Sequence, residues 1–426
     1  MRTLNVSIER RGKMVSAGSI AGNGPSDARF RYSEGYLRDP YAAAISLSLP
    51  LQEEPFTPAQ TENFFEGLLP EGFTRRSVAQ RMHVDEGDYL SILHCLGREC
   101  LGAICITEEG EDREASYEPA DERQIRALAA EGASKSVELV TRAHLSLTGA
   151  TGKAGLYYDE RRNRWYLPRG TAPSTHIVKQ SHVRLDAIVT NEQLSLMTAE
   201  RCGIGIPRSF ILDTGHGAEH EVLFATRRYD RVFPPDPELI SGLPRPLRLH
   251  QEDFAQALGI PASAKYENAQ GGYMKEMFGL LRKFSSDPVT DLLRLWDIIV
   301  FDYLVGNTDA HVKNLSLLYS ADLTGIRLAP AYDIISTTAY ENSTRDMAFR
   351  IGGDLSLDDI TEDSFRRAAR DAGLGERMAM RRMEEMCGRF LSALRESVEE
   401  MTAAGYGKAA EMGERILQTG GIRGFL

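Results

Sequence analysis

The sequence predicts an α+β protein with an N-terminal α/β subdomain, a strand-rich middle part and a mainly helical C-terminal part. Strand and helix signals alternate up to residue 106, short strands separated by turn residues follow from about residue 139, and helical periodicity dominates beyond Arg248. The chain has 426 residues and is 42% hydrophobic. This is enough for roughly two or three domains of about 100 to 200 residues each.

Composition excludes several classes of protein. The formal net charge is -11 and no long basic block is present, which argues against unaided binding to nucleic acid, so we expect any DNA contact to be indirect, through a partner. Five cysteines without a CxxC pair argue against a disulfide scaffold or a zinc ribbon. The N-terminus has no apolar signal-peptide core, and the most hydrophobic stretch, residues 292–305, is interrupted by Asp297 and Asp302. We expect a soluble cytoplasmic protein with no membrane partner.

The first 106 residues are expected to form the α/β subdomain. Strands and helices alternate in it, at residues 3–8, 46–50, 58–69 and 88–96. Residues 107–120 are crowded with Glu and Asp and nearly devoid of aliphatic side chains, which is typical of a solvated segment. We therefore place an acidic connection at residues 107–136.

A strand-rich lobe is expected at residues 137–235. Its apolar runs are separated by turn-forming residues, so they should pair into an antiparallel sheet. The expected strands cover residues 144–147, 154–158, 164–167, 175–180 and 221–226. Between the last two, Thr190 and Gln193 have the spacing of a capping box, which predicts a helix from there to about Cys202.

A helical lobe is expected at residues 236–426. Asp287 and Pro288 form a good helix start. The apolar residues that follow recur at helical spacing: Leu292, Trp296, Ile299 and Tyr303. This spacing predicts a buried helix that ends at Gly306. From residue 364 to about 417, amphipathic helical patterns end at glycine-rich breaks.

The segment after Gly306 carries the strongest chemical signal. Asp309 and Asn314 have the spacing of the catalytic Asp and the metal-binding Asn in a kinase catalytic loop. Asp333 follows after two apolar runs that predict a hairpin. Phosphoryl transfer from ATP needs a carboxylate at the acceptor hydroxyl and oxygen ligands for Mg²⁺. The order of loop, hairpin and second loop is typical of the C-terminal lobe of kinases, although each residue alone is more often a helix cap or a turn former.

A glycine-containing run lies between two expected strands, from Ser146 to Lys153. Its two glycines let backbone amides approach phosphate oxygens, and Lys153 adds a cation. It is not a Walker A loop, because Leu147 and Ala154 replace required residues. An ordinary hairpin turn is equally consistent with this run. The residues that we assign to the nucleotide here are Thr148, Gly149, Ala150, Thr151, Gly152 and Lys153.

Three more residues fit the same chemistry. Lys179 follows an alternating strand, where kinases carry the lysine that contacts the phosphates and pairs with a helix glutamate. Glu192 is the candidate partner, although stabilisation of a helix N-terminus by its charge explains it equally well. His311 is expected to assist in catalysis by orienting the loop or contacting phosphate, with a structural loop histidine as the alternative.

Seven ordered segments resemble the HipA family of serine/threonine-kinase toxins, and the resemblance runs from about residue 3 to residue 391. The segments are residues 64–72, 97–103, 146–153, 175–179, 248–258, 306–314 and 329–334. The resemblance implies a two-lobed protein-kinase-like fold, related to the phosphatidylinositol kinases, preceded by a family-specific N-terminal subdomain. It also implies ATP and Mg²⁺ as cofactors, with Asp309 as catalytic base and Asn314 and Asp333 as metal ligands.

The resemblance also implies partners and regulation. HipB-like helix-turn-helix antitoxins restrain the family's toxins and tether them to operator DNA. The best-known members phosphorylate an aminoacyl-tRNA synthetase, which causes growth arrest or drug tolerance, known as persistence. The family autophosphorylates a serine at the head of the glycine loop, and Ser146 occupies that position.

The chain departs from the family pattern at two places. The glycine loop carries Thr148, Thr151, Gly152 and Ala154 where the family commonly reads A-G-A-Q-E-K-T, so we expect a more mobile loop. The hinge at residues 226–231 reads T-R-R-Y-D-R, which replaces an acidic residue by arginine. In this hinge we assign Tyr229 to the adenine side of the nucleotide.

Two other functions remain possible from the residues. A catalytically weak kinase-fold binding module would work by gripping its antitoxin and operator, but the complete set of Asp309, Asn314, Asp333 and Lys179 argues against a dead scaffold. A metal-dependent phosphohydrolase would use Asp309, His311 and Asp333 and release free phosphate. Transfer to a serine or threonine is the favoured reading.

Overall fold

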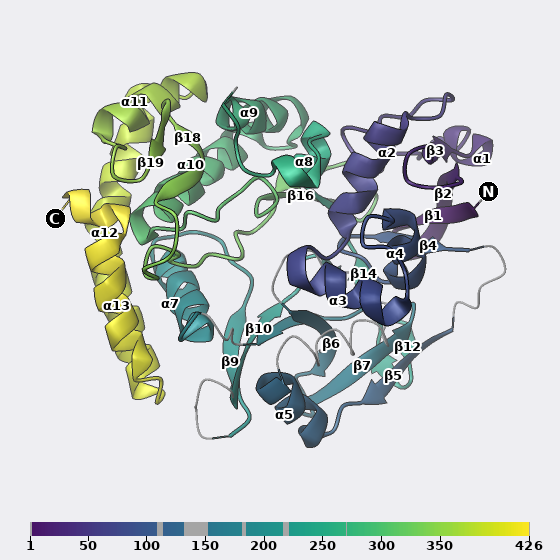
Figure 1. Ribbon diagram of the computed structural model, residues 1–426, viewed down its shortest axis with the longest axis horizontal. Coiled ribbons are helices and arrows are strands. Elements are labelled where there is room, and N and C mark those ends of the chain that lie inside the picture. Colours follow the sequence, from purple (N-terminus) through teal and green to yellow (C-terminus); the bar gives the residue numbers. More distant parts are fainter. Residues whose placement is uncertain are drawn as a thin grey trace. The chain divides into compact units, whose positions relative to one another are not determined.

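Figure 1 shows a computed structural model of the chain, in which residues 2–108, 114–131, 152–180, 185–215, 221–269 and 271–425 are described. The chain divides into two compact units. Unit 1 comprises Met1–Gln180, Ala225–Ala262 and Leu318–Gly325, and unit 2 comprises Ser181–Phe224, Ser263–Leu317 and Ile326–Leu426. Each unit therefore draws on both of the consecutive lobes that we expected at residues 137–235 and 236–426.

A four-stranded antiparallel sheet begins unit 1, with the strand order β3-β2-β1-β4. Its strands are β1 (Arg2–Arg10), β2 (Lys13–Gly22), β3 (Arg29–Tyr32) and β4 (Ile104–Thr107). Leu4, Val6 and Ile8 of β1 are fully buried. The alternation that predicted a strand at residues 3–8 thus corresponds to the buried face of a real sheet.

Short helices accompany this sheet: α1 (Glu34–Leu37), α2 (Pro58–Phe65), η1 (Glu66–Leu68), α3 (Gly72–Met82) and α4 (Tyr89–Leu96). A capping box starts α2, in which the side chains of Thr57 and Gln60 each accept from the other residue's backbone N–H. The Asp88 side chain caps α4 by accepting from Ser91 N. The helices predicted at residues 58–69 and 88–96 are confirmed.

The strand expected at residues 46–50 is wrong. Ser46 and Leu49 form only an isolated β-bridge, because Ser46 Oγ donates to Glu252 Oε2 at 2.5 Å and Leu47 N donates to Glu252 Oε1 at 3.0 Å. Burial raises the pKa of the Glu252 carboxyl to about 7, against the opposing effect of hydrogen bonds from Ser46 and Tyr319. The alternating apolar residues at 46–50 therefore belong to a buried turn beside the Glu252 carboxyl group, and not to a strand in a sheet.

Four neighbouring strands of a six-stranded sheet belong to unit 1, where they pair antiparallel in the order β5-β7-β6-β8. These strands are β5 (Ala115–Pro119), β6 (Lys153–Asp159), β7 (Arg164–Gly170) and β8 (His176–Gln180). The strands predicted at residues 154–158, 164–167 and 175–180 and their antiparallel pairing are confirmed. Tyr117, Tyr157 and Tyr166 form part of its core, where the Tyr117 and Tyr157 ring centroids are 4.4 Å apart. The strand expected at residues 144–147 lies outside the described residues.

The acidic connection is corrected for residues 115–131. This stretch contains strand β5, which pairs with β7, and helix α5 (Glu122–Glu131). Tyr117 is buried in the sheet, and Ile125, Leu128 and Ala129 form the buried stripe of α5. A few well-spaced apolar residues therefore outweigh the high local charge.

The remaining elements of unit 1 are short: β11 (Arg231–Val232), β12 (Leu239–Ile240), β13 (Leu243–Pro244), β14 (Leu247–Arg248), β15 (Gln251–Asp253) and α8 (Phe254–Leu258). Strand β10 (Val222–Arg227) crosses the division between the units and confirms the strand predicted near residues 221–226. Strand β16 (Ser316–Tyr319) crosses it too, as does the 3₁₀ turn η3 (Ala262–Ala264).

Unit 2 is mainly helical. Its helices are α7 (Ile188–Arg201), α9 (Tyr273–Phe284), α10 (Pro288–Val305), α11 (Glu362–Asp371), α12 (Glu376–Ala403), α13 (Lys408–Thr419) and the 3₁₀ helix η4 (Gly421–Phe425). Its strands are β9 (Ser209–Asp213), β17 (Ile326–Leu328), β18 (Asp346–Ile351) and β19 (Asp354–Ser356). Helix α7 packs against α12 and α13, and Figure 1 shows the two C-terminal helices in yellow and yellow-green.

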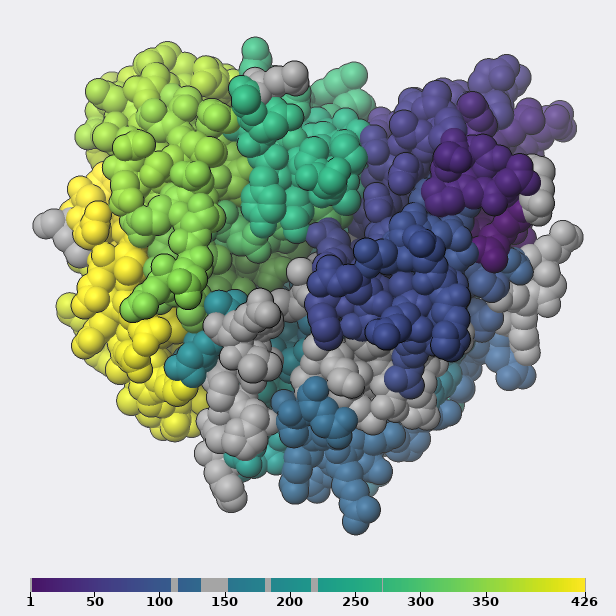
Figure 2. Space-filling model, in the orientation of Figure 1, coloured from purple at the N-terminus to yellow at the C-terminus, as the bar shows by residue number. Residues whose placement is uncertain are grey.

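The long helix α10 is the centre of this unit. Trp296 is completely buried, and its Nε1 donates to Ala379 O of α12 at 3.0 Å. Leu292, Ile299 and Tyr303 are buried on the same helix, which confirms the predicted apolar face. The outer side chains of α12 and α13 form part of the surface drawn in Figure 2. Among the described residues, none of the helices is long and apolar enough to cross a membrane.

The predicted start of α7 is wrong. The helix begins at Ile188, after Ala187 in a left-handed conformation, and it has no side-chain cap. Thr190 and Gln193 are buried within its first turns. They therefore do not form the predicted capping box, because that motif requires its first residue to precede the helix.

Candidate active site

Helix α10 positions the loop at residues 307–314. The Asp287 side chain caps its start, as predicted, and its end is Gly306 with φ +76°. A Cβ atom at Gly306 would lie 2.0 Å from Thr338 Oγ1. Both the backbone conformation and the available space therefore require glycine, and the 307–314 loop leaves the helix in one defined direction.

The 307–314 loop is closed by its own hydrogen bonds. His311 N donates to Asp309 O at 2.8 Å, and Asn314 N donates to His311 O at 2.7 Å. The Asn314 side chain completes the loop, because its Nδ2 donates to Asp309 O at 2.8 Å. The amide nitrogen is thus used inside the loop, so Oδ1 is the atom that Asn314 can offer to a cation.

Asn307 ties the loop to the helix. Its N and Nδ2 atoms donate to Asp302 O and Asp302 Oδ1, both at 2.8 Å, and its Oδ1 accepts from Asp309 N at 3.2 Å. Burial raises the pKa of Asp302 to about 7, and the hydrogen bond from Asn307 opposes this rise only in part. A buried carboxyl thereby fixes the backbone just before Asp309.

Asp309 lies at the surface of unit 2. Its side chain is 53% exposed, whereas that of His311 is 7% exposed, and His311 Nε2 lies 4.0 Å from Asp309 Oδ1. The hydroxyl of Tyr266 donates to the same oxygen, Oδ1. An exposed carboxylate on an anchored loop is accessible to a substrate hydroxyl, which a general base requires.

Asp333 follows the predicted hairpin, formed by β16 and β17. Its φ is +58°, which residues other than glycine rarely adopt and Asp tolerates better than most. The preceding residue, Tyr332, hydrogen-bonds through its hydroxyl to Lys313 O at 3.2 Å and to Ser316 Oγ at 2.6 Å. The residue before Asp333 is therefore hydrogen-bonded to the residue before Asn314.

The segment after Asp333 is bonded to the same region. Thr337 Oγ1 donates to Gly306 O at 3.0 Å and receives a hydrogen bond from Thr308 N at 2.7 Å. Asn191 of α7 pairs with Ser336 in both directions, with Nδ2 donating to Ser336 O and Ser336 N donating to Oδ1, each at 2.9 Å. The structure thus brings the segments of Asp309, Asn314 and Asp333 together within unit 2.

The predicted phosphate-binding lysines lie in unit 1. Lys153 of β6 is directly opposite Lys179 of β8 in the antiparallel register, so both side chains leave the same face of the sheet. A Cβ on Gly152 would lie 2.2 Å from Nε2 of the Gln180 side chain, so a larger residue next to Lys153 would require that side chain to move.

Other predicted nucleotide residues fall in different parts of the chain. Tyr229 is partly buried in unit 1, and its hydroxyl donates to Gln251 Oε1. Glu192 is buried in α7 of unit 2, so its pairing with Lys179 of unit 1 stays a prediction. Ser146 and the predicted loop residues Thr148, Gly149, Ala150 and Thr151 lie outside the described residues.

The residues of unit 2 fit a magnesium ion better than a closed metal site. The side chains of Asn314 and Asp333 carry oxygen atoms, the type of donor that suits a hard cation. Among the described residues there is no group of three or more His, Cys, Asp and Glu side chains that could hold a metal. Mg²⁺ is typically held by one or two protein ligands together with substrate phosphates, so two oxygen donors are compatible with it.

Comparison with known proteins identifies the family. Residues 11–107 match the model described as the HipA N-terminal domain, and residues 145–394 match the model described as the HipA-like C-terminal domain. The second match alone covers more than half of the chain. The chain belongs to the HipA family.

Relatives resemble this HipA-family chain over most of its length. A Sinorhizobium fredii protein named "Putative kinase Y4mE" is 34% identical over 94% of this chain and 93% of its own. The serine/threonine-protein kinase toxin HipA of Shewanella oneidensis is 27% identical over 78% of this chain and 75% of its own. A solved Shewanella oneidensis HipA, in complex with HipB and operator DNA, covers 97% of this chain and 96% of its own, at 22% identity and a TM-score of 0.78. The chain thus has the HipA fold, a kinase-like α+β fold.

The HipA N-terminal domain and the hinge share a buried ionic network in unit 1. Glu99 is 1% exposed, and its Oε1 receives hydrogen bonds from Arg228 at 3.1 Å and Arg231 at 2.9 Å. Its Oε2 binds Arg248 at 2.7 Å. Burial alone would raise the pKa of Glu99, but the guanidinium groups of Arg231, Arg248 and Arg228 outweigh it and hold this pKa well below the ordinary value.

The network includes two further acids. Asp230 receives two hydrogen bonds from Arg228, at 2.9 and 2.8 Å, and one from Gly102 N at 2.8 Å. Glu9 of β1 binds Arg248 and Arg245. Arg227, which replaces the family's acidic hinge residue, is exposed and lies outside the network. The hinge of this HipA-family chain therefore keeps its buried ionic partners despite that change.

Several residues of the site were not predicted. Asn191, Thr337, Tyr332 and Tyr266 each form a hydrogen bond in or beside the predicted loops, across 16 to 145 positions of sequence. Asn191 had a weak local signal, because Ser195 one turn later also carries a polar side chain on the same buried face and donates to it at 3.2 Å. Tyr266 had no local signal.

Proposed function

We propose that this HipA-family chain is an ATP-dependent serine/threonine protein kinase that acts as the toxin of a HipBA-like toxin–antitoxin pair. The observation that carries the proposal is the junction in unit 2. There Asn314 bonds the carbonyl of Asp309, and Tyr332 joins the segment of Asp333 to that of Asn314. The kinase names of the curated relatives agree with this reading.

The proposed chemistry assigns one role to each residue. Asp309 orients the serine or threonine hydroxyl of the substrate and accepts its proton during transfer. His311 packs beside Asp309 and orients the loop. Asn314 and Asp333 hold Mg²⁺ through their side-chain oxygens. The bound ion neutralises charge on the phosphates of ATP.

Unit 1 supplies the nucleotide contacts in this proposal. Lys179 and Lys153, on one face of the sheet, bind phosphate oxygens, with Glu192 as the partner of Lys179. Thr148 to Gly152 cover the phosphates with backbone amides. Tyr229 contacts the adenine side. Catalysis then consists mostly of positioning and electrostatic stabilisation.

Partners and regulation follow the same family reading. The solved Shewanella oneidensis HipA is bound to HipB and operator DNA, and we infer a HipB-like helix-turn-helix antitoxin for this chain, with DNA contacted through it. The net charge of -11 agrees with indirect DNA contact. The proposed target is a translation component such as an aminoacyl-tRNA synthetase, with growth arrest as the result. Ser146 is the proposed site of silencing autophosphorylation.

The test combines the purified chain with labelled ATP, Mg²⁺ and a cell extract, with and without the product of the neighbouring open reading frame. We expect one labelled protein band in addition to the labelled chain, and weaker labelling when the antitoxin is present. Asp309→Asn and Asp333→Asn should abolish both signals without changing the circular dichroism spectrum. The matched control is Asp359→Asn, because Asp359 is an exposed aspartate of the same unit.

Three results would contradict the proposal. Undiminished phosphate transfer by Asp309→Asn would remove the assigned base. Growth arrest that persists in cells expressing Asp309→Asn would instead favour the binding module, because toxicity would then not need phosphoryl transfer. Release of free phosphate without a phosphoprotein would indicate a phosphohydrolase.

A further inference from the structure

Tyr266 contacts both residues that the mechanism places at the acceptor. Its hydroxyl donates to Asp309 Oδ1, and its ring meets the His311 ring edge to face, with centroids 5.2 Å apart and planes at 81°. The residue is 46% exposed, so burial of the ring does not explain its orientation. A phenol that donates to a carboxylate forms a charge-assisted hydrogen bond, roughly twice as strong as a neutral one.

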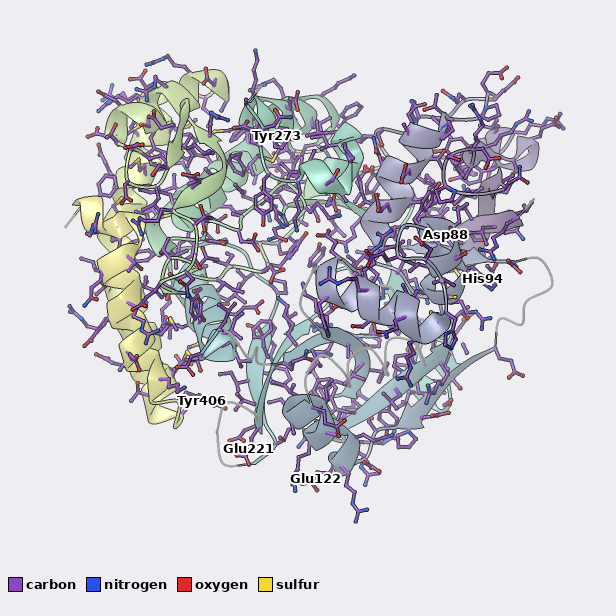
Figure 3. The ribbon with its side chains drawn as sticks, viewed as in Figure 1. Asp88, His94, Glu122, Glu221, Tyr273 and Tyr406 are labelled. Atoms are coloured by element: carbon purple, nitrogen blue, oxygen red, sulfur yellow. The ribbon has the colours of Figure 1, made fainter. Side chains whose placement is uncertain are left out.

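The chain on both sides of Tyr266 is anchored. Before it, Ala264 O accepts from the Tyr273 hydroxyl at 2.6 Å. After it, Glu267 N donates to Ala348 O at 2.8 Å. Tyr273 stands at the start of α9, where Figure 3 labels it, and it is buried. The backbone that carries Tyr266 is therefore held by α9 and β18.

Glu267 adds three further hydrogen bonds to this anchor. Its Oε1 accepts from Tyr273 N at 2.8 Å, and its Oε2 accepts from Arg350 N at 2.7 Å and from Arg350 Nη1 at 3.3 Å. The Glu267 side chain is 1% exposed, so these bonds are shielded from water and strong. Because Glu267 is anchored in this way, the backbone of the neighbouring Tyr266 is fixed. A fixed backbone is needed for an exposed side chain to hold another side chain in place.

We propose that Tyr266 is a positioning residue for the acceptor carboxylate: its hydroxyl holds Oδ1 of Asp309 and its ring holds His311, so that Oδ2 is presented to the substrate hydroxyl. This inference rests on the proposed function, because it takes Asp309 as the base. Tyr266 acts through Asp309 and needs no contact with substrate. Without it, Asp309 would sample several rotamers at its exposed position, and fewer of them would be productive.

The proposal predicts a specific kinetic signature. Tyr266→Phe keeps the ring beside His311 and removes the hydrogen bond, whereas Tyr266→Ala removes both. Because neither group binds ATP, KM for ATP should stay unchanged while kcat falls, by roughly 10-fold in Tyr266→Phe and up to about 100-fold in Tyr266→Ala. The control is Tyr406→Phe, because Tyr406 is a tyrosine of the same unit that follows the C-terminal end of α12 in the sequence.

Three results would overturn the inference. An unchanged kcat in Tyr266→Phe would show that the hydroxyl does not position the base. A higher kcat/KM for the acceptor would show instead that Tyr266 blocks the base and has to leave before substrate binds. A fall in kcat accompanied by a lower melting temperature in Tyr266→Phe but not in Tyr406→Phe would point to a structural role.

A spectroscopic measurement separates this inference from the proposed function. With tyrosine labelled by ¹³C at Cζ, the Tyr266 resonance is identified by its loss in Tyr266→Phe. It should shift in Asp309→Asn and stay in place in Asp359→Asn. No shift in Asp309→Asn overturns the inference whatever the activity of the wild type. If the resonance shifts in Asp309→Asn but the wild-type chain transfers no phosphate, the contact exists and only the proposed kinase function is refuted.

Discussion

Asn191 and Ser336 form a reciprocal hydrogen-bonded pair across 145 residues of sequence, with both bonds 2.9 Å long. Asn191 is completely buried on helix α7. Its amide replaces two backbone partners that the irregular segment after Asp333 would otherwise lack. Helix α7 therefore stabilises the conformation of the proposed metal-binding loop.

We predict that Asn191→Leu destabilises unit 2 and reduces phosphoryl transfer. The substitution keeps the branching and the number of heavy atoms of the side chain but leaves Ser336 N and O without their buried partner, at a cost of about 1–3 kcal/mol for each unsatisfied group. Urea unfolding followed by circular dichroism measures the loss, and the Mg²⁺ concentration for half-maximal activity should rise. Asn342→Leu, at an exposed turn position of the same unit, serves as the control. Equal stability of the two variants would contradict the prediction.

Gly306→Ala should abolish activity by displacing the 307–314 loop. An alanine here combines an unfavourable φ of +76° with a Cβ only 2.0 Å from Thr338 Oγ1. Gly405→Ala is the matched control, because Gly405 has φ +98° and no atom within 4 Å of the added Cβ.

The control variant isolates the backbone strain, about 1–2 kcal/mol. Gly306→Ala should be destabilised by more than Gly405→Ala in thermal unfolding, and it alone should lose phosphoryl transfer. If the two variants unfolded at the same temperature and Gly306→Ala stayed active, the close approach of Thr338 would not matter for the site.

The elements that the sequence predicted are those whose signal is local. Helix α10 shows its start at Asp287 and its apolar face in the side-chain spacing, and β6, β7 and β8 are separated by turn-forming residues. The strand expected at residues 46–50 was wrong because Ser46 bonds Glu252, more than 200 residues away. No local pattern contains that partner.

The candidate site was predicted in the same uneven way. Asp309 and Asn314 were found because their spacing within one loop is part of the chemistry. Asn191 and Tyr266 were missed because their roles depend on partners that only the tertiary fold supplies. For the same reason, no local sequence pattern indicated that Glu99 and the hinge arginines form one buried network.

Glu99→Gln should strongly destabilise unit 1. Removing this charge leaves Arg228, Arg231 and Arg248 buried with too few acids, and breaking a buried ion pair typically costs about 3–5 kcal/mol. We expect the urea midpoint to fall by a corresponding amount, with little dependence on salt because the network is shielded from solvent.

Glu118→Gln provides the control for this prediction. Glu118 also pairs with an arginine of unit 1, Arg169, but its side chain is 55% exposed. Exposed pairs contribute about 0–1 kcal/mol, so this variant should unfold almost like the wild type. If Glu99→Gln behaved like Glu118→Gln, the network would not stabilise the hinge.

Asp302 should make stability depend on pH in a direction opposite to that of a paired surface carboxylate. Burial raises its pKa from the ordinary 3.8 to about 7 in the folded chain. Between these values the folded state keeps the proton while the unfolded state has lost it, so the free energy of unfolding decreases as pH rises. The contribution is fully present below about pH 4 and is lost above about pH 7, and it amounts to on the order of 4 kcal/mol.

Asp302→Asn removes this dependence because its side chain is neutral at every pH and can still accept from Asn307. Urea unfolding at pH 5 and pH 8 should therefore show a smaller decrease in the variant, which becomes more stable than the wild type at pH 8. A residual decrease is expected from Glu252, whose pKa is also raised to about 7 by burial. Asp359→Asn, at an exposed position, should leave the wild-type decrease unchanged. An equal decrease in Asp302→Asn and the wild type would mean that Asp302 is ionised in the folded chain and that Asn307 compensates its burial.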